Sequence, residues 1–364
     1  MRWAPKLLDR LNFSNAAFRI TVGVIAIVVI GSGLVLLCGA SPWTAAVGIV
    51  EGAVGERYMV AETIVSTIPL ALIGLSLAPA LRAGVFSIGS EGQVAIGAMT
   101  ATGAIMLLPS DSAALLLIGG AVAGVFGGLV WAAIPAALRA YGRVNEILST
   151  LLLNYIAGFL LLWMLKTLLA ARRIVPLPQS DPLPDAALIP KMLEGTRLHW
   201  GFLFVPVFAL ALAWWLKSPR GLSYYIIATH VGLASRMGLT TARAVMTTML
   251  VSGAVAGLVG WLQVAGVAGT LYPTAAGGLG FTGVLVALLG RLGPLGILVA
   301  ALFFSVLKTG ADGLQAGTGV PSSIATVIEG LVLFVAALAF AAPSRLPIQS
   351  APKQSEHRVA TATG

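Results

Sequence analysis

An acidic and an amide side chain interrupt one long apolar stretch of the sequence. The stretch reads GVFSIGSEGQVAIGAM, residues 84–99, and it carries Glu91 and Gln93 near its centre. A carboxylate at the middle of a bilayer costs about 2.5–3.5 kcal/mol on insertion scales, and such groups usually face a bundle interior or an aqueous path. The glycines at 84, 89 and 92 predict a broken or re-entrant helix near 84–97, which only protein or a water-filled cavity can surround.

Three roles are open for Glu91 from these residues alone. Its carboxylate could accept hydrogen bonds from backbone N–H groups freed near the start of a helix, where the helix dipole favours a negative charge. It could contact a polar solute directly. It could also bind and release a proton during transport.

A second polar group of residues begins another apolar segment, VNEILSTLLLNYIA at 144–157. Asn145 and Glu146 stand where a helix would start, and both types suit capping of its first turn. Asn154 lies nine residues after Asn145, about 14 Å along a helix axis. Asn154 and Tyr155 therefore fall inside the span, where Asn154 could face a pore or bond to a neighbouring helix.

A third segment, IIATHVGLASRMGLTTARAV at 226–245, joins two apolar runs. One face of a short helix there would carry its small and apolar residues, namely Ile227, Val231, Ala234 and Gly238. The polar residues lie off that face: Thr229, His230, Ser235 and Arg236. Such an amphipathic helix could lie on the membrane surface or dock into a partner subunit.

No arrangement of residues typical of an enzyme or a metal site occurs in the sequence. There is no HExxH segment and no GxxxxGK[ST] phosphate loop, and SIGSEG does not match GxSxG. The histidines at 199, 230 and 357 fall in different loops, and Cys38 is the single cysteine. If the protein uses ATP, another subunit must hydrolyse it.

The composition predicts an all-α polytopic membrane protein. Of 364 residues, 58% are hydrophobic and 10% are charged, against about 25% charged in a typical soluble domain. The net charge of +9 is spread over short loops, which argues against nucleic-acid binding. About ten spans are expected, at 20–40, 64–81, 84–108, 112–136, 147–166, 199–217, 244–266, 274–290, 294–311 and 321–341.

The distribution of arginine and lysine predicts that both termini are cytoplasmic. The expected organisation is a cytoplasmic segment at 1–19, a transmembrane domain at 20–341 and a disordered cytoplasmic tail at 342–364. Within that domain, 167–198 is an external loop with five prolines, and 217–243 is the longest cytoplasmic connection. Small residues repeat every four positions at Gly120, Gly124 and Gly128, and again at Gly253 and Gly257, which predicts close helix packing.

These segments resemble a known family. GVFSIGSEGQVAIGA resembles the GxFNIGxEGQ segment of permease subunits of ATP-binding-cassette (ABC) importers, in their ribose and nucleoside branch. NEILSTLLLNYIA is similar to the NEVISTxxLNYIA segment of the nucleoside-type permeases. GGLGFTGVLVALLGRLGPLG at 277–296 and KTGADGLQ at 308–315 look like the family's C-terminal half. The resemblance covers roughly residues 64–340.

The resemblance implies a subunit of a multi-pass importer in the cell (inner, or cytoplasmic) membrane that moves nucleosides or related sugar-containing solutes by alternating access. It implies two cytoplasmic ATPase subunits that bind ATP and magnesium, a second and different permease chain, and an external solute-binding lipoprotein. This chain would be the larger permease, without a cofactor of its own.

The resemblance also assigns residues to roles. The expected solute pathway contains Ser87, Glu91, Gln93, Asn154 and Tyr155. The expected coupling helix runs from 228 to 239 and contains Ala228, Thr229, His230, Ala234, Ser235, Arg236, Gly238 and Leu239. Two departures stand out: Ser87 replaces the family's asparagine, and the Asn-Pro pair usual in the coupling loop is missing.

Two other transport functions remain as alternatives. A secondary transporter driven by an ion gradient would use Glu91 as its titrating group. A permease of the same superfamily for branched-chain amino acids would share the fold but not the NYIA segment. Within the leading hypothesis, we expect Glu91 to stabilise a break in a helix that lines the translocation path.

Overall fold

The computed structural model describes residues 16–39, 41–172 and 177–318, together with residues 323, 327, 330 and 331. Most of the expected first segment and of the last span, and all of the tail at 342–364, lie outside the described residues. The chain divides into two compact units, residues 34–326 and the two ends of the chain. Every element discussed below, except the first part of α2, belongs to the unit 34–326.

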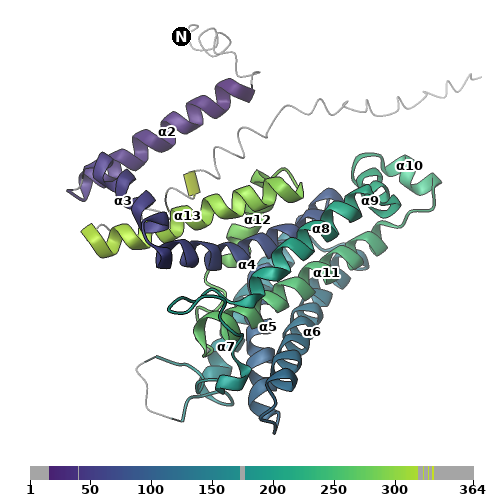
Figure 1. Ribbon diagram of the computed structural model, residues 1–364. Coiled ribbons are helices and arrows are strands. Elements are labelled where there is room, and N and C mark those ends of the chain that lie inside the picture. The colour runs from purple at the N-terminus through teal and green to yellow at the C-terminus, as the bar shows by residue number, and fades with distance from the viewer. Residues whose placement is uncertain are drawn as a thin grey trace, which may run out of the picture. The chain divides into compact units, whose positions relative to one another are not determined.

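Helices make up 76% of the described chain (Figure 1). Their bounds are α2 Ala16–Leu37, α3 Pro42–Val54, α4 Arg57–Arg82, α5 Ser90–Leu107, α6 Ala113–Ala140, α7 Glu146–Lys166, α8 Phe204–Lys217, α9 Pro219–Thr229, α10 Val231–Arg236, α11 Thr241–Trp261, α12 Leu279–Leu289 and α13 Pro294–Thr318. Short 3-10 turns stand at Asp185–Ala187 and Trp200–Leu203, and α11 continues as a π-helix over Leu262–Ala268.

Six described helices are long and apolar enough to cross a membrane, and a bent pair at Val28–Leu37 and Pro42–Val54 would make a seventh. The six lie at Arg57–Arg82, Ala113–Ala140, Glu146–Lys166, Trp200–Lys217, Thr241–Ala268 and Pro294–Gln315. The all-helical membrane fold is therefore confirmed, whereas the number ten stays a prediction. The expected span at 274–290 contains only the 11-residue α12, which is too short to cross a bilayer by itself.

Helix α3 is present in the structure but was not predicted from the sequence. The apolar pattern there is interrupted by Gly48, Glu51 and Gly52, so 42–54 has no continuous hydrophobic run. A local signal was nevertheless present, because Ser41 precedes Pro42 at the first helical position, a typical way to start a helix.

Helix α5 lies at the centre of the described unit and packs against α6, α11, α7 and α12. Figure 1 shows α5, α6 and α11 side by side below α4 and α8. Twelve of the 18 residues of α5 are buried, including polar ones such as Gln93 and Thr102. A helix surrounded by protein does not need an apolar surface, which explains how α5 tolerates its polar first turn.

Glycines bring α5, α6 and α11 into backbone contact. A Cβ atom on Gly257 of α11 would lie 2.1 Å from the carbonyl oxygen of Gly124 on α6 and 3.0 Å from the Cα of Gly128. A Cβ on Gly97 of α5 would lie 2.4 Å from the Cα of Gly257. The close packing predicted from the spacing of small residues is confirmed at Gly124, Gly128, Gly253 and Gly257.

Candidate functional site

The break expected near Glu91 lies between α4 and α5, at residues 83–89. Helix α4 ends with Gly84 in the left-handed region, at φ +75°. The N–H of Gly84 bonds to Leu81 O (3.1 Å) and that of Val85 to Ala80 O (2.9 Å), which is the Schellman pattern that ends many helices. The chain then runs without helix to Gly89, so Glu91 falls in the first turn of the following helix.

Side chains from α7 hold the turn into α5. Asn154 Nδ2 donates to Ile88 O (2.8 Å), and its Oδ1 accepts from the N–H of Gly92 (2.9 Å). Thr150, one turn earlier on the same face of α7, accepts from the N–H of Ile88 (3.3 Å). Of the two roles left open for Asn154, the hydrogen bond to a neighbouring segment is the one with observed partners.

Glu91 binds the start of α12. Its Oε1 accepts from the N–H of Gly278 and its Oε2 from the N–H of Gly280, each at 2.8 Å. Gly278 is the N-cap residue of α12 and has φ +81°. The carboxylate therefore accepts hydrogen bonds from freed backbone N–H groups, but these belong to α12 and not to α5, its own helix.

The N-termini of α5 and α12 meet at this point. A Cβ on Gly280 would lie 2.1 Å from the backbone nitrogen of Glu91, so the two helix starts touch through their backbones. Each helix start carries a partial positive charge, and two of them in contact repel. The carboxylate of Glu91 stands between them and offsets that repulsion with charge-assisted hydrogen bonds.

Several buried polar atoms near the start of α5 lack a hydrogen-bond partner among the described residues: Ser90 Oγ, Gln93 Oε1 and Trp131 Nε1. Gln93 lies against Gly89, and Trp131 of α6 lies against Gly92. Such atoms can bind water or a polar solute at little cost, since they have no protein partner to lose. The sequence offered no signal for Trp131, which stands in an apolar, glycine-rich helix.

The structure brings four of the five expected pathway residues together. Ser87 is buried and its Oγ accepts from the N–H of Gly89 (3.3 Å), close to Glu91, Gln93 and Asn154. Tyr155 is 62% exposed and lies on another face of α7. The role of these residues in transport stays a prediction.

The helix expected at 228–239 is in fact two helices, α9 and α10, which meet at His230. His230 has φ −137° and ψ 70°, so the apolar stripe does not continue from one helix into the next. Ile227 of α9 and Ala234 of α10 nevertheless lie in one buried cluster with Ala244 of α11.

The end of α10 explains three residues of the expected coupling segment. Gly238 has φ +69°, its N–H bonds to Ser235 O (3.1 Å), and the N–H of Leu239 bonds to Ala234 O (2.9 Å). This is a second Schellman pattern, in which Leu239 also packs on the cluster of Ala234. The remaining residues of the segment are exposed: Ala228, Thr229, His230, Ser235 and Arg236.

Asn145 and Glu146 stand at the start of α7. Asn145 is the N-cap residue, and its Oδ1 accepts from the N–H groups of Ile147 (2.9 Å) and Leu148 (3.3 Å). Glu146 pairs with Arg139 at the end of α6 (3.0 Å). The loop between α6 and α7 is thus closed by one cap and one ion pair.

Comparison with known proteins identifies the family. A family model described as "Branched-chain amino acid transport system / permease component" matches residues 59–337, which is most of the chain. The chain belongs to this family of transporter permeases. No solved structure matches it.

Characterised relatives of this permease are ABC transporter subunits. The glucose ABC transporter permease protein of Haloferax volcanii is 32% identical over 76% of this chain and 76% of its own length. The guanosine ABC transporter permease protein NupP of Bacillus subtilis is 30% identical over 85% of this chain and 90% of its own length. The nucleoside ABC transporter permease protein NupB of Lactococcus lactis is 28% identical over 94% of this chain and 97% of its own length.

The family settles the class of function. The protein is a multi-pass permease of the cell membrane, and it is a transport subunit rather than an enzyme, because the ATPase of such a transporter is a separate subunit. The intramembrane polar residues described above therefore belong to the membrane subunit of a transporter.

The loop between α7 and α8 of the permease is folded onto the π-helical end of α11. Its backbone bonds to that segment from Leu183 N to Gly269 O (2.8 Å) and from Ile189 N to Ala265 O (2.9 Å). Arg197 at the loop's end pairs with Glu62 of α4, donating from Nε at 2.9 and 3.1 Å. This loop, expected to be external, is anchored to two different helices.

His199 fixes the end of this loop. It is 1% exposed, its Nδ1 accepts from the N–H of Gly201 (3.1 Å), and a Cβ on Gly266 would lie 2.6 Å from its Nε2. Burial lowers the pKa of His199 to about 4, because the charged imidazolium would lose its hydration. His199 is therefore neutral at pH 7.

Acid is expected to destabilise the permease through His199. In the unfolded chain its pKa is about 6.5, so between pH 6.5 and pH 4 the unfolded state binds more protons than the folded state. The stability contributed by neutral His199, up to about 3 kcal/mol, is present above pH 6.5 and is lost as the pH falls toward 4.

The variant His199→Gln provides the control, because glutamine keeps an acceptor for Gly201 and does not titrate. Thermal unfolding of both proteins in detergent at pH 7.5 and pH 4.5 measures the effect. The wild type should lose more stability than the variant on acidification, and an equal loss in both would contradict the role given to His199.

Proposed function

We propose that this permease moves nucleosides or related sugar-containing solutes into the cell as part of an ABC importer. The observation that supports the solute class is the set of relatives: they are named for glucose, guanosine and nucleosides, and a sugar ring is common to all of these solutes. The description of the family model mentions branched-chain amino acids, which lack such a ring.

The proposed assembly contains this chain, a second and different permease, two ATPase subunits that bind ATP and magnesium, and an external solute-binding lipoprotein. The complete chain has about ten spans with both termini in the cytoplasm. In this arrangement the loop at 167–198 faces the lipoprotein, and the segment 228–239 faces an ATPase. The chain contacts membrane lipid and no nucleic acid.

The shape of the segment 228–239 supports its role in coupling. The buried side chain of Ala234, together with Ile227 just before the segment, packs on Ala244 of α11, and the two Schellman-type bonds close the end of α10. Its polar side chains, among them His230 and Arg236, remain exposed and available to a partner. When the ATPase subunits close, force on this segment would reach α11 directly and change the access of the solute path.

The junction of α5 and α12 is the proposed part of the solute path. Transporters commonly bind solutes where helices are discontinuous and helix N-termini point at the solute. Here two helix starts converge, and the unpartnered atoms of Ser90, Gln93 and Trp131 are close by. Sugar hydroxyl groups both donate and accept hydrogen bonds, so they suit such a mixed set of atoms.

Mild extraction of the chain from its own membrane, followed by mass spectrometry of the proteins that co-purify, tests the assembly. The purified complex is then reconstituted in vesicles and assayed for uptake of labelled guanosine, glucose and leucine, with ATP or with a proton gradient. We expect ATP-driven uptake of a sugar-containing solute. Uptake of leucine alone would contradict the solute class, and uptake by this chain alone, driven by protons, would contradict the importer.

A further inference from the structure

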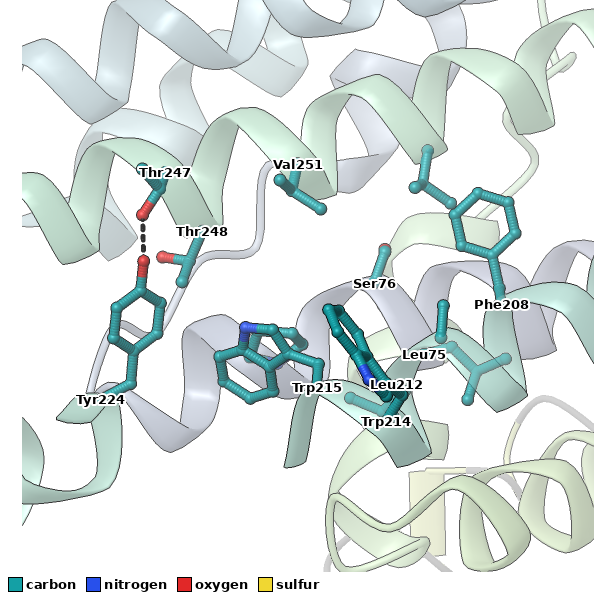
Figure 2. Close-up of a pocket in the computed structure, with 13 residues that line it drawn as sticks. Leu75, Ser76, Phe208, Leu212, Trp214, Trp215, Tyr224, Thr247, Thr248 and Val251 are labelled. Carbon is teal, nitrogen blue, oxygen red and sulfur yellow. Dashed lines mark hydrogen bonds between the residues drawn. The ribbon is translucent and has the colours of Figure 1, made fainter. Parts of the chain in front are cut away.

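An apolar pocket of about 280 Å³ lies between α4, α8, α9 and α11, away from the junction of α5 and α12. Aromatic rings form one wall, namely Phe208, Trp214 and Trp215 of α8 and Tyr224 of α9. Figure 2 shows Trp215 and Tyr224 on one side of the pocket and Thr247, Thr248 and Val251 of α11 on the other. The rings of Trp215 and Tyr224 meet edge to face, with centroids 5.4 Å apart.

The hydroxyl groups that line the pocket already have hydrogen-bond partners. Ser76 Oγ donates to Ile73 O and Thr248 Oγ1 donates to Ala244 O, each at 2.8 Å. Tyr224 pairs with Thr247 (Figure 2). The protons of these hydroxyl groups are already engaged, so they offer no donor to the oxygens of a sugar-containing solute, and burying those oxygens without a donor is unfavourable. The pocket therefore fits an apolar chain better than a transported solute.

Three basic residues stand where α8 joins α9 and where α11 begins, each within four residues of one that lines the pocket. Arg220 lies four residues before Tyr224 on α9, and Arg243 lies four residues before Thr247 on α11. Residues four apart share a helix face, so each arginine is one turn away from a pocket residue. Lys217 is the last residue of α8.

These three cations are exposed, and none of them takes part in an ion pair within the described chain. Tryptophan and tyrosine beside arginine and lysine are typical of the boundary between lipid tails and headgroups. At that depth, anionic headgroups attract arginine and lysine side chains.

We propose that this pocket binds an acyl chain of an anionic phospholipid, with its headgroup held by Lys217, Arg220 and Arg243. The bound lipid would contact α8, α9 and α11 together, next to the segment 228–239. A neutral phospholipid with the same acyl chains would fill the pocket equally well. It would lack the attraction between the anionic headgroup and the cations, and each cation raises the affinity about fivefold.

Native mass spectrometry of the purified chain in detergent, titrated with phosphatidylglycerol or phosphatidylcholine of equal chain length, tests this proposal. We expect phosphatidylglycerol to bind at least tenfold more tightly. The variant Arg243→Gln should lower that affinity about fivefold. Its matched control, Arg57→Gln, removes an exposed arginine from the start of α4, 18 residues before the pocket residue Leu75, and should leave the affinity unchanged.

A third variant tests the pocket itself. Ala211 lines the pocket and is exposed, so Ala211→Phe should fill the space without disturbing the core and should lower the binding of both lipids. Thermal unfolding without lipid checks that each variant is folded. Equal binding of the two lipids, equal losses in the two arginine variants, or unchanged binding by Ala211→Phe would each overturn the proposal.

Discussion

Glu91→Leu is expected to abolish most uptake and to lower the stability of the permease. The substitution leaves the N–H groups of Gly278 and Gly280 without their observed acceptors. Each buried N–H left without a partner costs about 1–3 kcal/mol. The variant also removes the negative charge from between two helix starts that repel each other. Uptake into vesicles and thermal unfolding, at equal amounts of protein, measure the two effects.

The uptake and the stability of Glu91→Gln are expected to lie between those of the wild type and those of Glu91→Leu. From shape alone this substitution appears mild, but the structure shows that both carboxylate oxygens accept a hydrogen bond. Glutamine has one acceptor oxygen, and its NH₂ group would face a second donor. It therefore keeps one of the two bonds and loses the charge.

The relation between stability and uptake separates the possible roles of Glu91. If Glu91 holds α12 in place, uptake and unfolding temperature fall together across the two variants. If Glu91 instead carries protons, both variants lose uptake equally, although Glu91→Gln keeps one hydrogen bond and unfolds at a higher temperature than Glu91→Leu. Glu51→Leu, at an exposed acidic position of α3, serves as the control for loss of an acid elsewhere.

Gly257→Leu is expected to prevent folding, and Gly257→Ala to destabilise the permease by about 1–3 kcal/mol or more. A Cβ atom at this position meets the backbone of Gly124 and Gly128. Backbone atoms cannot rotate away as a flexible side chain can, so α6 and α11 would have to separate. Yield of monodisperse protein and thermal unfolding measure the outcome.

Gly158→Ala is the matched control for this glycine. Gly158 lies inside α7, and a Cβ there meets no atom within 4 Å. Alanine is favoured over glycine in a helix by about 1 kcal/mol, so this variant should be neutral or slightly more stable. Equal behaviour of the two alanine variants would show that the contact between α6 and α11 is looser than described.

Local features of the sequence predicted much of the fold. Continuous apolar runs located most of the helices, and the spacing of glycines predicted close helix packing, which the structure places between α6 and α11. The cap at Asn145 follows from residue type and position. These features depend on neighbours within a few turns, which a sequence displays directly.

Contacts between distant segments could not be predicted in the same way. The chemistry of Glu91 suggested backbone N–H partners, but those partners lie 187 and 189 residues away. The break at His230 had no such local signal, because the spacing of Ile227, Val231 and Ala234 fits a continuous helix equally well. Trp131 joins the site only through the packing of α6 on α5.

The glycine contacts among α5, α6 and α11 have a mechanical consequence. Helices whose backbones touch have no side-chain layer that could shear, so these three should move as one block. One boundary of this block lies where α5 meets α12, and there the observed backbone contact is between the starts of the two helices. The two hydrogen bonds of Glu91 cross that boundary. Helix α12 can rotate about this point while both bonds are kept, but it cannot slide away from α5 without breaking them.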